Sequence, residues 1–156
     1  QSPEITVSIE TQAVKYRILF WQQKLYNVDN FLYYLVNDWF PATVDGQSDF
    51  GFNSKHEVEQ GGITPFDIYG NGVLLYSGHY LGIEEPIGSL RMECIRDGIE
   101  DFEYLTILEK LCGREETELV IRQLTTSLGE YNADEELFTR LRCVLGKLIE
   151  NELAGN

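Results

Sequence analysis

Apolar residues recur every three or four positions in three stretches of the chain, which is the spacing of one face of an α-helix. The first stretch covers residues 12–25. Its apolar stripe consists of Val14, Ile18, Trp21 and Leu25. Thr11 stands directly before it and is of a type that favours helix N-caps. The pattern predicts an amphipathic helix that follows Thr11 and buries this stripe.

The second helical stretch, residues 89–112, is longer and carries apolar residues on two faces. Ser89 can cap its start, and Gly113 can end it. One face consists of Ile95, Ile99, Phe102 and Thr106, and the other of Leu105, Leu108 and Cys112. Two apolar faces predict burial between a sheet and an outer layer.

Residues 113–156 can supply that outer layer as a pair of helices. The first is expected over residues 115–128, where the apolar positions are Val120, Ile121, Leu124 and Leu128. Asn132 and Glu135 have the spacing of a capping box, which predicts the start of the second helix. Its apolar positions are Leu137, Phe138, Leu141, Val144, Leu145, Leu148 and Ile149.

Short apolar runs predict strands. Residues 31–36 and 72–77 are almost wholly apolar, as in strands covered on both faces in a parallel sheet. Residues 5–9 are rich in β-branched types and predict a strand or an extended lead-in. Residues 40–69 between the two runs are rich in Gly, Asp, Asn and Gln, which predicts a long loop. Connections of that length are usually functional or mobile.

The order helix, strand, long loop, strand, helix predicts βα units and an α/β fold. Only two or three strands are predicted, too few to close an eight-stranded barrel. We therefore expect a fragment within one domain. Residues 1–112 would form a partial barrel with the active-face loop at 40–69, and residues 113–156 a helical pair packed on the barrel helices.

The charge narrows the choice of partners. The 156 residues include 26 acidic and 12 basic ones, for a net charge of −14. Such a charge repels phosphate backbones and is compatible with uncharged ligands such as sugars. We expect no nucleic-acid partner. No apolar run reaches the roughly 20 residues of a membrane span, so we expect no membrane partner either.

The ends and the cysteines bear on the compartment. The start, Gln1-Ser-Pro-Glu, lacks a signal peptide and an initiator Met, which suggests a processed chain or a piece of a longer one. Cys94, Cys112 and Cys143 have no CxxC spacing, and we expect buried free thiols. This cysteine usage favours a cytoplasmic location. His56 and His79 lack metal-ligand spacing, so we expect neither a metal nor a cofactor.

Four ordered motifs carry a resemblance to a known family. They are Arg17-Ile-Leu-Phe-Trp21; Val28-Asp-Asn-Phe-Leu-Tyr-Tyr34 with Asn37 and Trp39; Gly70-Asn-Gly-Val-Leu-Leu-Tyr-Ser-Gly78; and Ser89-Leu-Arg91 followed by Arg96-Asp-Gly-Ile-Glu-Asp-Phe-Glu-Tyr104. Over residues 10–110 the chain resembles the family called domain of unknown function 4091, which is related to glycoside hydrolase family 123. One departure is Tyr34, where the family's strand often has Trp.

The resemblance implies the C-terminal portion of a (β/α)8 TIM-like barrel. Its relatives hydrolyse N-acetylhexosaminides by substrate assistance, with an Asp-Glu pair that orients the acetamido group and protonates the leaving group. That pair lies upstream of the matched region, so no catalytic residue is expected here. The resemblance implies a hydrolase as the parent protein and an inactive chain when this segment stands alone.

Five residues are candidates for sugar binding. Asn37 and Trp39 follow the predicted strand at residues 31–36, at the end where barrels place their active sites. An indole suits the apolar face of a pyranose and an amide suits its hydroxyls, although Trp39 could simply cap the core and Asn37 could simply stabilise the turn. Tyr34 and Tyr76 could stack on a sugar or pack in the core. Arg91 could bind a sugar hydroxyl or carboxylate, or neutralise nearby acids.

Acidic residues crowd the long helix at Asp97, Glu100, Asp101 and Glu103. Arg96 can pair with Glu100 at i,i+4 spacing, and a solvated, salt-bridged face is the interpretation we favour over catalysis. Arg17 is expected to pack on the sheet.

Two functions follow from the sequence. The first is a C-terminal segment of a glycoside-hydrolase-like protein that contributes to a glycan-binding cleft. The alternative is a self-contained carbohydrate-binding or protein-interaction module without catalysis. A partial barrel exposes strand edges, so association with another copy or with the missing barrel portion is a further expectation.

Overall fold

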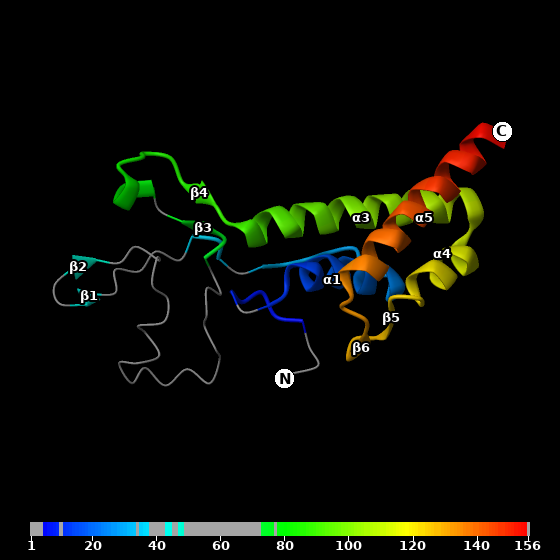
Figure 1. Cartoon of the computed structure of the whole chain (residues 1–156), viewed down its shortest axis with the longest axis horizontal. Helices are drawn as coiled ribbons and strands as arrows, with labels where there is room; N and C mark the ends of the chain where they lie inside the picture. The colour runs from blue at the N-terminus through cyan, green and yellow to red at the C-terminus, as the bar shows by residue number, and fades with distance from the viewer. Residues whose placement is uncertain are drawn as a thin grey trace. The chain divides into compact units, whose positions relative to one another are not determined.

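The computed structural model describes residues 5–9, 11–33, 35–37, 43–44, 47–48, 73–76 and 78–155. This part of the chain is mixed α/β and mostly helical (Figure 1). It forms two compact units. The larger contains residues 5–6, Gln12–Phe31 and 94–155, and the smaller contains the described residues of 7–11 and 32–93.

Four α-helices are present among the described residues. They are α1 (Ala13–Leu25), α3 (Leu90–Cys112), α4 (Arg114–Ile121) and α5 (Glu135–Gly155). The predicted bounds of the first two are confirmed to within a residue. Ser89 caps α3 as predicted, because the Met92 amide donates to its hydroxyl at 3.2 Å. Gly113 ends α3 with a φ of 90°, a backbone conformation that favours glycine.

The strands are short and pair antiparallel. The pairs are β1 (Thr43–Val44) with β2 (Gln47–Ser48), β3 (Leu75–Tyr76) with β4 (Ile87–Gly88), and β5 (Thr125–Ser127) with β6 (Glu130–Tyr131). A 3-10 helix, η1 (Gly78–Leu81), follows β3. Of the strand predicted over residues 72–77, the described residues 73–76 show β3 and a single bridge at Val73. The loop predicted at residues 40–69 contains β1 and β2, and the rest of it lies outside the described residues.

The larger unit has one hydrophobic core, to which all four helices contribute. Its buried members are Val14, Ile18, Trp21, Leu25, Leu105, Leu108, Val120, Ile121, Leu124, Phe138, Leu141, Leu145 and Ile149. The stripe predicted for α1 is fully confirmed. On α3 the face with Leu105 and Leu108 is buried, whereas Ile99 on the other face is exposed.

A glycine lets α1 and α3 approach closely. A Cβ built on Gly98 of α3 would lie 2.3 Å from a ring carbon of Phe20 on α1. The ring of Phe20 in turn meets the ring of Phe31 edge-on, with centroids 5.3 Å apart. Any side chain at this crossing would require the Phe20 ring or the two helices to shift.

Asp101 is the charged centre of the larger unit, and the prediction of a solvated position is wrong for it. Its side chain is 0% exposed and accepts a bidentate pair from Arg17, with both distances 2.8 Å. Arg142 of α5 donates to the same carboxylate at 2.6 Å. Elsewhere on α3 the prediction holds, since Arg96 lies 3.2 Å from Asp97 and 4.0 Å from Glu100.

Aromatic rings hold both arginines in place. The guanidinium carbon of Arg142 lies 3.6 Å from the Tyr104 ring centroid, and that of Arg17 lies 4.6 Å from the Phe138 ring. The cluster thus ties α1, α3 and α5 together through charge and stacking. Arg17 was expected to pack on a sheet. It instead forms an ion pair with Asp101 of α3.

Several local predictions are wrong. Residues 31–33 and 35–36 form no strand, and Leu35 adopts a φ of 63° that a regular strand excludes. Residues 5–9 form no strand, so only the alternative of an extended lead-in stays open for them. The helix predicted over residues 115–128 ends at Ile121, and the β5–β6 hairpin follows. The N-cap of α1 is Gln12, whose side chain makes no capping bond, so Thr11 stands one residue too early.

The start of α5 also differs from its prediction. Asp134, and not Asn132, caps the helix, because the Leu137 amide donates to its carboxylate at 2.7 Å. The side chain of Asn132 accepts from the Asp134 amide at 3.0 Å and shapes the turn that precedes the helix.

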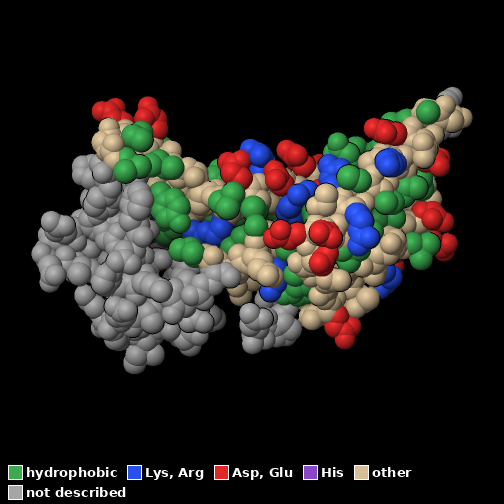
Figure 2. Space-filling model, viewed as in Figure 1, with side chains coloured by type: hydrophobic (Ala, Val, Ile, Leu, Met, Phe, Trp, Pro, Cys, Tyr) green, Lys and Arg blue, Asp and Glu red, His purple; other side chains and the backbone are tan. Residues whose placement is uncertain are grey.

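The visible face of the larger unit carries many charged side chains. Figure 2 shows Lys and Arg side chains interspersed with Asp and Glu side chains over its helices. None of the described helices is both long enough and apolar enough to cross a membrane.

Candidate functional site

In the smaller unit, the segment from Val73 to Tyr76 is a junction where distant parts of the chain meet. Val73 forms an antiparallel bridge with Asn37. The amides of Leu74 and Leu75 both donate to the Val36 carbonyl at 2.8 Å. The segment is thereby fixed to residues 36–37 from one side.

The other side of the segment is fixed by the chain that leads into α3. Leu75 pairs with Gly88 and Tyr76 with Ile87 in the β3–β4 ladder. The Ser89 amide then donates to the Leu74 carbonyl at 2.9 Å. Ser89 also caps α3, so the segment, the strand and the first turn of the helix are connected through hydrogen bonds.

Arg91 reaches the same segment from the first turn of α3. Its side chain donates to the Val73 carbonyl, to the Tyr76 hydroxyl at 3.3 Å and to the Val7 carbonyl at 3.3 Å. Arg91 is only 6% exposed. A guanidinium carries five N–H donors in a planar fork, which suits it to several acceptors at once.

Three of the five candidate residues are therefore neighbours of this junction. Asn37 is exposed and bridged to Val73, and Tyr76 is half-buried in β3. Arg91 is buried and donates to the Val73 carbonyl and the Tyr76 hydroxyl. Tyr34 and Trp39 lie outside the described residues, and their predicted stacking role stays a prediction. Sequence reasoning missed Val73 and Val7, which act through backbone carbonyls that no side-chain pattern reveals.

The chemistry available at the junction is that of amide and hydroxyl groups. An amide and a phenol hydroxyl can each donate and accept hydrogen bonds. Arg91 is the only Lys or Arg side chain among the described residues of the smaller unit. The carboxylates of Glu84, Glu85 and Glu93 in the same unit are exposed. This charge balance disfavours a strongly anionic ligand.

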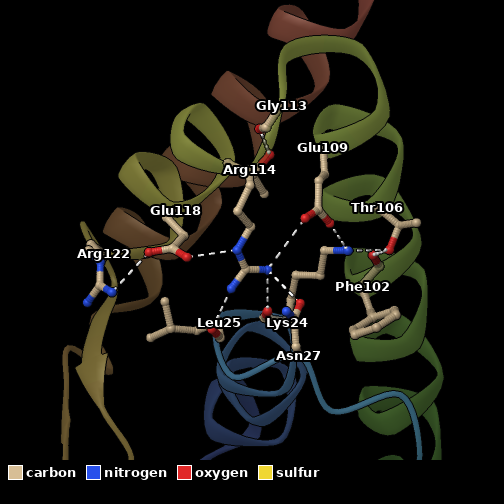
Figure 3. A network of polar contacts seen from close by, with 11 residues as sticks. Lys24, Leu25, Asn27, Phe102, Thr106, Glu109, Gly113, Arg114, Glu118 and Arg122 are labelled. Atoms are coloured by element: carbon tan, nitrogen blue, oxygen red, sulfur yellow. Dashed lines mark hydrogen bonds and ion pairs between the residues drawn. The ribbon is translucent and has the colours of Figure 1, made fainter.

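A second polar cluster lies in the larger unit, at the end of α1 (Figure 3). Arg114 of α4 donates to the Lys24 carbonyl at 3.0 Å and to the Leu25 carbonyl at 2.6 Å. Its guanidinium also donates to Glu118 at 2.7 Å and lies 3.6 Å from Glu109. Lys24 pairs with Glu109 as well.

This second cluster has a structural role. The last carbonyls of a helix have no partner within the helix, and a cation at that end also opposes the helix dipole. Arg114 meets both needs for α1. Every charged group in the cluster is paired with an opposite charge, and we assign no ligand to it.

The second cluster makes stability depend on pH. The hydrogen bond from Lys24 and the charges of Lys24 and Arg114 hold the pKa of Glu109 below its ordinary value. The hydrogen bonds from Arg114 and Arg122 lower the pKa of Glu118. Both carboxyls are therefore more acidic folded than unfolded. Their stabilisation is present above the unfolded pKa of about 4.3 and is lost as pH falls through the folded values.

We expect urea unfolding between pH 7 and pH 3 to show this loss. The double variant Glu109→Gln, Glu118→Gln should be less stable at pH 7 and should lose less stability on acidification than the unmodified chain. Glu115→Gln, an exposed change in the same helix α4, serves as the control and should leave the acid dependence as it is. Parallel curves for the double variant and the unmodified chain would contradict this assignment.

Comparison with known proteins adds no family assignment. No protein-family model matches the sequence, and a search of curated proteins finds no match.

Proposed function

We propose that this chain is the C-terminal segment of a glycoside-hydrolase-like protein, a portion of a (β/α)8 barrel that contributes side chains to a glycan-binding cleft. The sequence resemblance to domain of unknown function 4091 motivates the proposal. One observation supports it most. Asn37, Tyr76 and Arg91 were named from sequence as sugar-binding candidates, and they gather at one junction although they come from three separate segments.

The proposed roles follow from the chemistry of each group. Asn37 supplies an exposed amide and Tyr76 a phenol for hydrogen bonds to sugar hydroxyls, while the buried Arg91 donates to the Tyr76 hydroxyl. In this proposal Trp39 and Tyr34 supply the aromatic surface on which a pyranose stacks, the stacking alternative that the sequence leaves open for both. The catalytic Asp-Glu pair belongs to a preceding part of the barrel. The proposed ligand is a glycan or a small carbohydrate.

The proposal predicts binding without turnover. The purified chain should bind an N-acetylhexosamine oligosaccharide saturably in calorimetry and should not hydrolyse aryl N-acetylhexosaminides. Asn37→Ala and Tyr76→Phe should each weaken binding about fivefold, the effect of losing one hydrogen bond of about 1 kcal/mol.

Tyr131→Phe is the matched control, because it removes a tyrosine hydroxyl from β6 in the larger unit. It should leave the affinity unchanged. Clear turnover by this chain alone would contradict the assignment of catalysis to a missing segment. Absence of saturable binding to any neutral glycan tested would contradict the proposed function itself.

A self-contained binding module without catalysis is the second candidate. The core of the larger unit favours it, since twelve buried apolar residues from the four helices and Leu124 from the turn after α4 pack together without any other chain. A monomer that unfolds in one cooperative transition and binds glycan would support the module. A chain that gains order only with the rest of a barrel would support the segment.

A further inference from the structure

The described contacts of Arg91 run to Val7, Val73 and Tyr76 within the smaller unit. We infer that Arg91 is a positioning residue, which sets the places of Tyr76 and of the Val73 backbone and does not itself touch the ligand. The inference on the ligand rests on the proposed function, whereas the positioning of the junction does not.

Burial is the first reason. Arg91 is 94% buried, since only 6% of it is exposed, and the exposed groups of the junction belong to other residues. A side chain that binds a glycan needs donors at the surface. The described contacts of Arg91 instead run to the backbone at Val7 and Val73 and to the side chain of Tyr76.

The identity of its acceptors is the second reason. Val7 and Val73 offer carbonyls from segments 66 residues apart in sequence, and Arg91 follows Val73 by 18 residues. Carbonyls in a buried place need a donor, and an unsatisfied one costs stability. Arg91 satisfies both and neutralises no carboxylate through them. In these contacts Arg91 holds the backbone at Val7 and Val73 in place.

The consequence for Tyr76 is direct. Arg91 donates to the Tyr76 hydroxyl at 3.3 Å, so the guanidinium fixes the phenol oxygen that the proposed function assigns to the ligand. Lysine cannot replace this arrangement, because a single ammonium cannot present a planar fork to several acceptors.

Hydrogen exchange tests the positioning without any ligand. In Arg91→Lys and Arg91→Gln, the amides of Leu74, Leu75 and Ser89 should exchange about tenfold faster or more, because their acceptors lose a fixed place. Amides in α1 and α5 should keep their protection. Arg96→Gln, five residues along the same helix and exposed, is the matched control and should change none of these rates.

Glycan affinity separates positioning from contact. Arg91→Lys should weaken binding of an N-acetylhexosamine oligosaccharide, and this loss should shrink once Tyr76→Phe is present, because Arg91 acts through Tyr76. Added salt should leave the affinity unchanged. Affinity lost in Arg91→Lys with unchanged amide protection would overturn the inference in favour of a direct contact. Failure of the unmodified chain to bind would refute the proposed function, and the exchange rates would still decide the positioning role.

Discussion

Replacing Asp101 with asparagine is expected to destabilise the larger unit by about 3–5 kcal/mol, the range for breaking a buried ion pair. The substitution keeps the shape of the side chain but removes its charge. It also turns an N–H group toward Arg17 and Arg142, which both donate to the carboxylate. Urea unfolding followed by circular dichroism measures the change in the free energy of unfolding.

The matched control for Asp101 lies one helical turn earlier. Asp97→Asn removes the same charge from a side chain that is 40% exposed and paired with Arg96. Exposed ion pairs contribute about 0–1 kcal/mol, so the control should cost less than 1 kcal/mol. Equal losses for the two variants would contradict the central place of Asp101 in the core.

Replacing Gly98 with alanine is the second large effect. The new Cβ would lie 2.3 Å and 2.9 Å from two ring carbons of Phe20, so the helices α1 and α3 must move apart or the ring must turn. Overpacking of this kind costs about 1–3 kcal/mol, less the roughly 1 kcal/mol that alanine gains over glycine in a helix. We expect a net loss of stability, measured by thermal or urea unfolding.

Gly146 in α5 is the control, because a Cβ there meets nothing within 4 Å. Gly146→Ala should stabilise the chain by up to about 1 kcal/mol, the opposite sign. Phe20→Leu combined with Gly98→Ala should cost less than the sum of the two single changes, since the smaller side chain makes room. Stabilisation by Gly98→Ala alone would show that the crossing is looser than described.

The helices could be predicted because their signals are local. Ser89 and Gly113 mark the ends of α3 by capping and backbone preference, and the stripe of α1 is visible within four turns. The burial of Asp101 could not be predicted from local sequence. Its burial depends on Arg17 and Arg142, which lie 84 and 41 residues away in sequence.

The strands failed for a related reason. The run at residues 31–36 has strand composition, but no partner strand among the described residues pairs with it along its length, and Leu35 turns the backbone out of register. Similarly, Leu124 and Leu128 continue a helical spacing, yet Thr125 turns into the β5–β6 hairpin. There its hydroxyl donates to the Ser127 carbonyl at 3.0 Å. Propensity is overridden in both places, at residues 31–36 because a partner strand is lacking among the described residues and at Thr125 because a partner strand is present.

That Asn37, Tyr76 and Arg91 belong to neighbouring segments could be predicted from the sequence, but the geometry of their contacts could not. Asn37, Tyr76 and Arg91 could be selected together as sugar-binding candidates, because all three lie near the ends of predicted strands. The inward direction of Arg91 could not be predicted, since it is set by carbonyls at Val7 and Val73. The sequence does not indicate which backbone carbonyls will accept such bonds, because every residue carries one.

Mapping glycan contacts by amide chemical shifts tests the central claim most directly. Titration of the labelled chain with an N-acetylhexosamine oligosaccharide should shift the amides of Asn37, Val73 and Tyr76 with one common dissociation constant, and those of α4 and α5 should stay in place. Shifts confined to the helical unit, or none at the junction up to saturating sugar, would contradict the glycan site.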